Sequence, residues 1–269
     1  MYAGYRIQRN AVTQHHRLLH PIADARLAWG TFEDCLAAFH AIQARDQIRT
    51  NSDHLVLLLH GFLRSKESFT PMQRALIREG YDAVAVNYPS SHRSIAGHAE
   101  QVSQILDHAE DVRTVSFVCH SMGGLIARKV LATYADWQSR IQFNRLVMIA
   151  TPNYGSVAAE LLLELPGGVF RALGGPSTED LAPEGVAKIP IPNQKFGVIA
   201  GVKGDGRGFN PLLPGDDDMT VSAESVLLAG AEDSMTINAI HTFIMAKKAV
   251  IEATIHYLET GRFQPEREP

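Results

Sequence analysis

The chain has 269 residues, of which 45% are hydrophobic and 20% charged, and its formal net charge is −4. This apolar content is ordinary for a globular protein and excludes a disordered or low-complexity chain, while the charge offers no electrostatic footprint for nucleic acid. The 2 cysteines are too few for a disulfide scaffold or a zinc site, and they fit a reducing compartment.

The beginning of the chain lacks the continuous apolar stretch of a secretory signal. No apolar run approaches the roughly 18 residues that a helix needs to cross a bilayer. We therefore expect a cytoplasmic protein without integral membrane contact. The sequence leaves its oligomeric state open.

Short apolar segments alternate with amphipathic ones along the chain. The expected strands are 54–59, 82–87, 114–119, 146–150, 196–200 and 226–228. The first expected helix follows Thr31 as its N-cap, and the second starts at Thr70, with Pro71 in its first turn and Gln73 in a capping box, and ends at Gly80. The other expected helices cover 95–108, about 122–134 and 244–260, the last of which ends at Gly261. This alternation predicts βαβ units and a mainly parallel sheet with helices on both faces.

We expect residues 1–269 to form a single domain, in which 1–50 is an N-terminal extension with a helix and 153–193 is an insertion. Long connections of this kind are usually functional or mobile. The insertion is rich in apolar residues, and Leu162, Val169 and Phe170 are its candidate substrate-binding side chains. Whether it packs on the sheet or moves as a lid, its apolar side favours an uncharged ester over a charged metabolite.

Ser121 is the candidate nucleophile, because the segment 118–124 (VCHSMGG) joins an apolar strand directly to a helix. A sharp turn at this point exposes the hydroxyl above the sheet, and the small Gly123 leaves room for the turn. The N-terminus of the helix directs the backbone N–H of Met122 toward developing negative charge. The alternative is an ordinary serine at a helix N-cap.

Ordered short motifs surround this serine. The chain resembles an α/β-hydrolase of the bacterial lipase and carboxylesterase type over roughly residues 50–260. The segments that carry the resemblance are His60-Gly61-Phe62, Asn87-Tyr88-Pro89, the Ser121 turn, 151–156 (TPNYGS) and Ile240-His241-Thr242. One departure is Cys119, which stands where the serine motif usually has glycine.

The resemblance implies the rest of the site. It makes the backbone N–H of Phe62 the second oxyanion donor beside Met122, and His241 the base that follows the acid in chain order. It places the acid at Asp218, with Asp217 next and Asp205 as an outside choice. The acidic run 216–218 could instead hold a cation such as Ca²⁺ or form a solvated loop.

The sequence thus predicts a serine hydrolase that cleaves apolar acyl esters through an acyl-enzyme, with Ser121, Asp218 and His241 as its catalytic triad. It needs no cofactor and no metal. The alternatives are an acyltransferase or thioesterase with the same triad, or a non-enzymatic binding protein on a hydrolase scaffold. The expected partner is a small-molecule or lipid-like ester, not nucleic acid.

Overall fold

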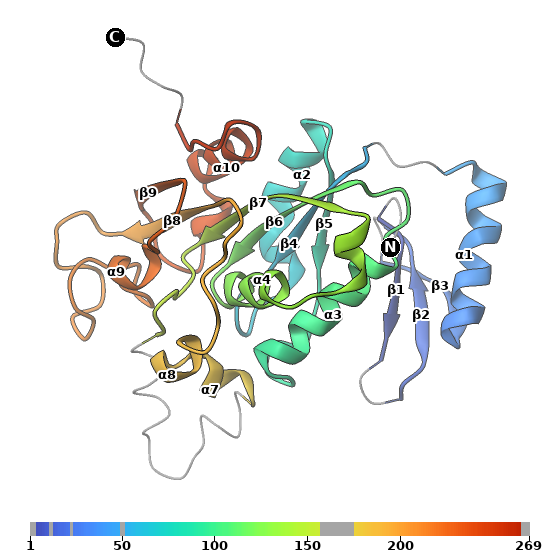
Figure 1. Ribbon diagram of the computed structural model, residues 1–269, viewed down its shortest axis with the longest axis horizontal. Helices are drawn as coiled ribbons and strands as arrows, with labels where there is room; N and C mark the ends of the chain where they lie inside the picture. The colour runs from blue at the N-terminus through green and yellow to red at the C-terminus, as the bar shows by residue number, and fades with distance from the viewer. Residues whose placement is uncertain (1–3, 11–12, 22–23, 49–51, 157–174, 265–269) are drawn as a thin grey trace.

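The computed structural model describes residues 4–10, 13–21, 24–48, 52–156 and 175–264. A six-stranded sheet in the order β5-β4-β6-β7-β8-β9, with every neighbouring pair parallel, forms its centre (Figure 1). In chain order the strands are β4 (His54–Leu59), β5 (Asp82–Val86), β6 (Thr114–His120), β7 (Gln142–Ile149), β8 (Phe196–Val202) and β9 (Asp233–Asn238). The predicted α/β class is confirmed.

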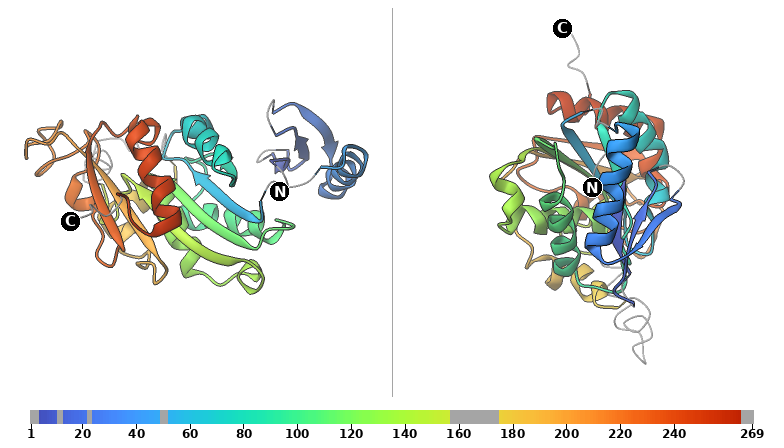
Figure 2. Two further views of the ribbon diagram at one scale, coloured as in Figure 1. Left: turned by 90° about the horizontal axis from the view of Figure 1, so that it is seen from above. Right: turned by 90° about the vertical axis from the view of Figure 1, so that its right-hand side faces the viewer.

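Helices cover both faces of this sheet (Figure 2). They are α2 (Thr70–Arg78), α3 (Ile95–Asp107), α4 (Met122–Ala132) and α10 (Lys248–Thr260). The alternation of β4 shows how the layers form: Leu57 and Leu59 pack with α3 and α4, whereas Val56 and Leu58 pack with α2 and α10. A continuous apolar strand is therefore required here, because both of its faces are buried.

The start of α2 differs from the prediction. A 3₁₀ turn, η1 (Lys66–Phe69), runs directly into α2, so Phe69 is the N-cap and Thr70 is the first helical residue. The Gln73 amide donates to the Ala83 carbonyl at 2.9 Å instead of closing a capping box. Gly80 follows the helix at φ +90°, a conformation that glycine adopts without strain, and it ends the helix as predicted.

The carboxyl-terminal part of the sheet also differs. The predicted strand 226–228 is wrong: α9 (Ala223–Val226) ends there, and Val226 and Leu228 are buried without forming a strand. The last strand is β9, which alternates between half-buried and exposed residues at the edge of the sheet. The closing helix is divided, since the 3₁₀ turn η4 (Ile244–Ala246) precedes α10, and Gly261 caps α10 in a left-handed conformation as expected.

The N-terminal part contains a small antiparallel sheet that the sequence did not predict. Its strands are β1 (Arg6–Arg9), β2 (His16–Leu19) and β3 (Arg26–Gly30), and α1 (Phe32–Asp46) packs on them through Cys35 and Phe39. The predicted N-cap Thr31 is confirmed, because its hydroxyl accepts the Asp34 N–H and the Asp34 carboxylate accepts the Thr31 N–H.

This small sheet lies beside the β5 edge of the large sheet (Figures 1 and 2). Asp24 links the two parts, because its carboxylate pairs with Arg6 of β1 and with Lys66 of η1. The extent of the single domain and the position of its insertion boundaries stay predictions.

The described part of the insertion contains two short helices, α7 (Ser177–Leu181) and α8 (Pro183–Val186). Leu181, Val186 and Ile189 join the core on the α3/α4 side of the sheet. A further 3₁₀ turn, η2 (Asp136–Ser139), precedes β7. Leu162, Val169 and Phe170, the candidate substrate-binding residues, lie outside the described residues.

Candidate functional site

Ser121 occupies a strained turn between β6 and α4. Its backbone has φ +53° and ψ −125°, a region that residues with a Cβ rarely adopt. The turn is fixed on both sides, since the Ser121 N–H donates to the Ile149 carbonyl at 2.9 Å and the Thr151 hydroxyl donates to the Ser121 carbonyl at 3.0 Å. The nucleophile candidate is therefore held at the carboxyl end of the sheet, where parallel α/β proteins bind their ligands.

Two glycines allow α4 to begin this close to the sheet. A Cβ on Gly123 would lie 2.1 Å from the Leu59 carbonyl oxygen, and one on Gly124 would lie 2.1 Å from the Thr151 hydroxyl. Neither contact is sterically possible, so both positions require glycine. Cys119, in place of the usual glycine, is fully buried in β6, and burial raises the pKa of its thiol well above the ordinary value.

The loop after β4 reaches the same point. A Cβ on Gly61 would lie 2.9 Å from the Ser121 Cβ, so glycine permits the contact between this loop and the Ser121 turn. His60 supports the loop: its Nδ1 lies 2.8 Å from the Gly61 carbonyl, and its ring stacks on Tyr88 at 4.0 Å. Phe62 follows directly and is partly buried against the core.

Met122 is the first residue of α4 and is fully buried. The first N–H groups of a helix have no carbonyl partner within the helix, and they lie at the positive end of its dipole. The N–H of Met122 is thus the first of several backbone hydrogen-bond donors at the N-terminus of α4, next to Ser121.

Asp218 and His241 form a buried pair. His241 Nδ1 lies 2.7 Å from Asp218 Oδ2, and the His241 N–H donates to the Asp218 carbonyl at 2.8 Å. The second carboxylate oxygen of Asp218 accepts the N–H groups of Thr220 and Val221. These bonds orient the carboxylate and engage Nδ1 of the imidazole, so that within the described residues Nε2 is the ring nitrogen without a hydrogen bond.

The other candidate acids have different partners. Asp217 is also fully buried, but it accepts the backbone N–H groups of Phe209, Asn210 and Met219. Asp216 accepts backbone N–H groups of the loop 203–217, and Asp205 pairs with Lys203. The three consecutive aspartates therefore stabilise the loop by accepting backbone N–H groups, and of these three Asp218 contacts a histidine, His241.

His120 connects the serine turn to the histidine loop, a role that the sequence did not reveal. Its Nε2 lies 3.0 Å from the His241 carbonyl, and the centroids of the two rings are 4.7 Å apart. Burial, followed by the nearby His241, lowers the pKa of His120 well below the ordinary value, so the ring is neutral and donates from Nε2. The hydrogen bonds of the described residues include none between Ser121 Oγ and the His241 ring, a bond that often forms only when substrate is bound.

Arg128 is a second residue that the sequence did not reveal. It is almost fully buried in α4, and burial lowers the pKa of its guanidinium to about 10, so it stays charged at neutral pH. It donates to the carbonyls of Asn153, Ile189 and Pro190 and to the Asn153 side chain. Because these residues stand at both ends of the insertion, Arg128 anchors both ends to α4.

In the part of the chain that the structure describes, no group of three or more His, Cys, Asp or Glu side chains could hold a metal ion. No helix within the same residues combines the length and the apolar character that crossing a membrane requires.

Solved structures resemble the fold of this chain at low sequence identity. Lipase BlEst2 of Bacillus licheniformis in its mature form is 18% identical with a TM-score of 0.58, over 76% of this chain and 91% of that chain. The metagenomic carboxyl esterase MGS0156 is 19% identical with a TM-score of 0.60, over 80% of this chain and 78% of that chain. Phospholipase PlaB from Legionella pneumophila, in complex with thio-NAD, is 14% identical with a TM-score of 0.57, over 76% of this chain and 56% of that chain. These likenesses show the α/β-hydrolase fold.

None of the curated proteins compared with the chain matches it. A family described as a domain of unknown function, DUF7379, matches residues 24–161, a little over half of the 269 residues. The match includes the Ser121 turn and ends before Asp218 and His241. The chain belongs to the DUF7379 family and has the α/β-hydrolase fold.

Proposed function

We propose that the protein is a serine carboxylic-ester hydrolase that acts on apolar acyl esters. The observation that carries this proposal is the buried Asp218–His241 pair, linked through His120 to the strained turn of Ser121. A serine hydroxyl is a poor nucleophile, and a histidine held in one tautomer by a buried carboxylate supplies the base that it needs. The names of the structurally similar lipase and carboxyl esterase agree with this reaction class.

In the proposed mechanism, Ser121 Oγ attacks the ester carbonyl while His241 Nε2 takes its proton. The N–H groups of Phe62 and Met122 stabilise the oxyanion, a contribution typically worth about 10²–10³ in rate for each donor. His241 then protonates the departing alcohol and activates water, which releases the acid from Ser121. Asp218 keeps the imidazole oriented through both steps.

The acyl chain is proposed to lie against the insertion, whose sequence is rich in apolar residues between positions 158 and 173. This preference rests on composition: Leu162, Val169 and Phe170 are the proposed contacts. A profile of activity against acyl chain length, with soluble and emulsified esters, tests it directly.

The decisive experiment is hydrolysis of 4-nitrophenyl esters by the wild type and three variants. We expect Ser121→Ala to abolish turnover, and Asp218→Asn to lower kcat about 10⁴-fold because an amide there favours the wrong imidazole tautomer, with the proton on Nε2. Asp217→Asn is the matched control: it replaces an adjacent buried carboxylate whose hydrogen bonds, within the described residues, all come from backbone N–H groups, so kcat per folded molecule should change less than about tenfold. Undiminished turnover by Ser121→Ala would refute the proposal, and transfer of the acyl group to added alcohols in preference to water would favour an acyltransferase.

A further inference from the structure

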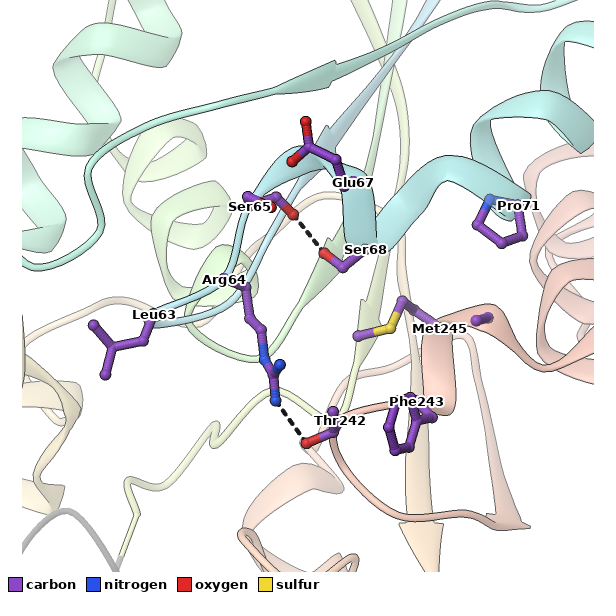
Figure 3. Close-up of a pocket in the computed structure, with 10 residues that line it drawn as sticks. Leu63, Arg64, Ser65, Glu67, Ser68, Pro71, Thr242, Phe243 and Met245 are labelled. Atoms are coloured by element: carbon purple, nitrogen blue, oxygen red, sulfur yellow. Dashed lines mark hydrogen bonds between the residues drawn. The ribbon is translucent and has the colours of Figure 1, made fainter.

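A groove opens beside the proposed catalytic residues, between the loop that follows β4 and the loop that follows His241. It has a volume of ≈ 570 Å³ and is lined by segments 63–71 and 242–246 (Figure 3). The Arg64 side chain extends along one wall and donates to the Thr242 hydroxyl at 2.7 Å. Leu63, Phe243 and Met245 supply apolar surface.

The position of the groove indicates which part of a substrate ester, the acyl part or the alcohol part, it would bind. Its lining comes from the α2/α10 side of the sheet, since Met245 packs in that layer, whereas the described end of the insertion packs on the α3/α4 side. The groove also begins at the residues that directly follow Phe62 and His241. The base protonates the departing alcohol, so the part of an ester nearest to His241 is the alcohol part.

The charge of the groove is the second observation. Arg64 is exposed, and within the described residues it forms no ion pair; Thr242 is its hydrogen-bond partner. Glu67 also lines the groove, but its carboxylate points away from Arg64 (Figure 3). A hydrogen bond from Ser65 lowers the pKa of Glu67, and Lys66 contributes to the same shift. The guanidinium fork of Arg64, suited to carboxylate and phosphate oxygens, is therefore available to a ligand.

We propose that this groove binds the alcohol part of the substrate ester and that Arg64 selects alcohols that carry an anionic oxygen group, a carboxylate or a phosphate. The inference rests on the proposed function and adds a substrate class to it. Hydrolysis breaks the bond between the acyl carbon and the ester oxygen. That oxygen takes a proton from His241, and the alcohol leaves with its anionic group unchanged. The apolar acyl part stays on Ser121 until water releases it.

Three butanoyl or succinyl esters test the proposal. In 4-nitrophenyl butanoate neither part is charged, in 5-butanoyloxy-2-nitrobenzoate the alcohol part carries a carboxylate, and in mono-4-nitrophenyl succinate the acyl part carries it. We expect Arg64→Gln to lower kcat/KM about tenfold for the second ester alone, mainly through KM, because a charge-assisted hydrogen bond is lost in ground state and transition state alike. Arg64→Lys should retain part of the activity. Competitive inhibition by glycerate and by glycerol 1-phosphate, each compared with glycerol, separates carboxylate from phosphate as the preferred group.

Arg113→Gln is the control for net charge, because Arg113 is an exposed arginine at the opposite end of the sheet, 3.8 Å from Asp53. It should leave all three esters unchanged. Equal effects of Arg64→Gln on the three esters would overturn the proposal, because Arg64 would then merely support the loop. If Ser121→Ala hydrolyses the neutral ester as fast as the wild type, the proposed function fails instead. Calorimetric binding of 5-hydroxy-2-nitrobenzoate to Ser121→Ala still tests the role of Arg64 in that case. The double variant with Arg64→Gln should bind this alcohol about tenfold more weakly than Ser121→Ala alone, and equal Kd values would refute the proposal that the groove binds it.

Discussion

The strained conformation of Ser121 predicts that glycine at this position is more stable than alanine, although both substitutions abolish the proposed activity. At φ +53° and ψ −125° a residue with a Cβ costs about 1–3 kcal/mol. Ser121→Ala keeps that cost, whereas Ser121→Gly removes it and loses about 0.5–1 kcal/mol through the greater freedom of the unfolded chain. The two ranges leave Ser121→Gly more stable than Ser121→Ala by about 1 kcal/mol, within limits of about 0–2.5 kcal/mol.

Urea and thermal unfolding measure this difference, and for a chain of this size each kcal/mol corresponds to roughly 2–4 °C in Tm. The matched control is the same pair of substitutions at Gln104, an exposed position inside α3, where glycine should be less stable than alanine by about 1 kcal/mol. The reasoning is refuted if glycine is the less stable member of both pairs. Comparison with alanine is essential, because both variants of Ser121 lack the hydroxyl.

Three further predictions follow from buried groups. His120→Asn should lower kcat about tenfold at nearly constant KM and shift the acid limb of the pH–rate profile, because the donor to the His241 carbonyl is lost. His120→Gln, whose amide reaches the position of Nε2, should restore most of kcat. An equal loss of kcat in both variants would contradict the positioning role of His120. Arg128→Met should lower the free energy of unfolding in urea by about 2–4 kcal/mol, since it leaves buried carbonyls unpaired, and Arg128→Lys by less; unchanged stability of the Met variant would contradict this account. Burial lowers the pKa of His60 and His98, so below about pH 6.5 the folded state binds fewer protons than the unfolded chain. The free energy of unfolding should therefore fall as the pH drops below about 6.5. The slope is about 1.4 kcal/mol per pH unit for each histidine, until the pKa of that histidine in the folded state is reached. Urea titrations between pH 7.5 and 5.5 measure the slope, and His98→Gln should reduce it by one histidine's share; an unchanged slope would be the contrary result.

Strands with both faces buried could be predicted from the sequence, because continuous apolar runs such as 55–59 leave few alternatives. The small N-terminal sheet could not be predicted, since its strands are four or five residues long and carry charged residues on partly exposed positions. β9 escaped prediction for a related reason: its sequence DSMTIN contains weak strand formers and gains its place from pairing with β8. Conversely, Val226 and Leu228 are apolar because they fill the core, not because they form a strand.

At the candidate site, the sequence indicated the residues that lie in short motifs, but it did not predict the contacts between distant segments of the chain. The neighbour of a nucleophile on a sharp turn points away from it, which excludes His120 as the base but does not indicate that it contacts His241. Its relation to His241 joins two residues that are 121 positions apart in the chain. Arg128 was equally hidden, because a lone arginine on a helix usually lies at the surface. The choice among three consecutive aspartates likewise depends on which carboxylate the loop directs toward a histidine.

The anchor formed by Arg128 has an evolutionary consequence. Most of its contacts are with main-chain carbonyls, which every amino acid supplies, so the anchor depends on the path of the chain and hardly on the side chains there. Segment 154–188 could therefore diverge in sequence and length, or be exchanged between relatives, while its two ends stay fixed against α4. Substrate preference could then change in evolution without any alteration of the residues proposed to carry out the chemistry.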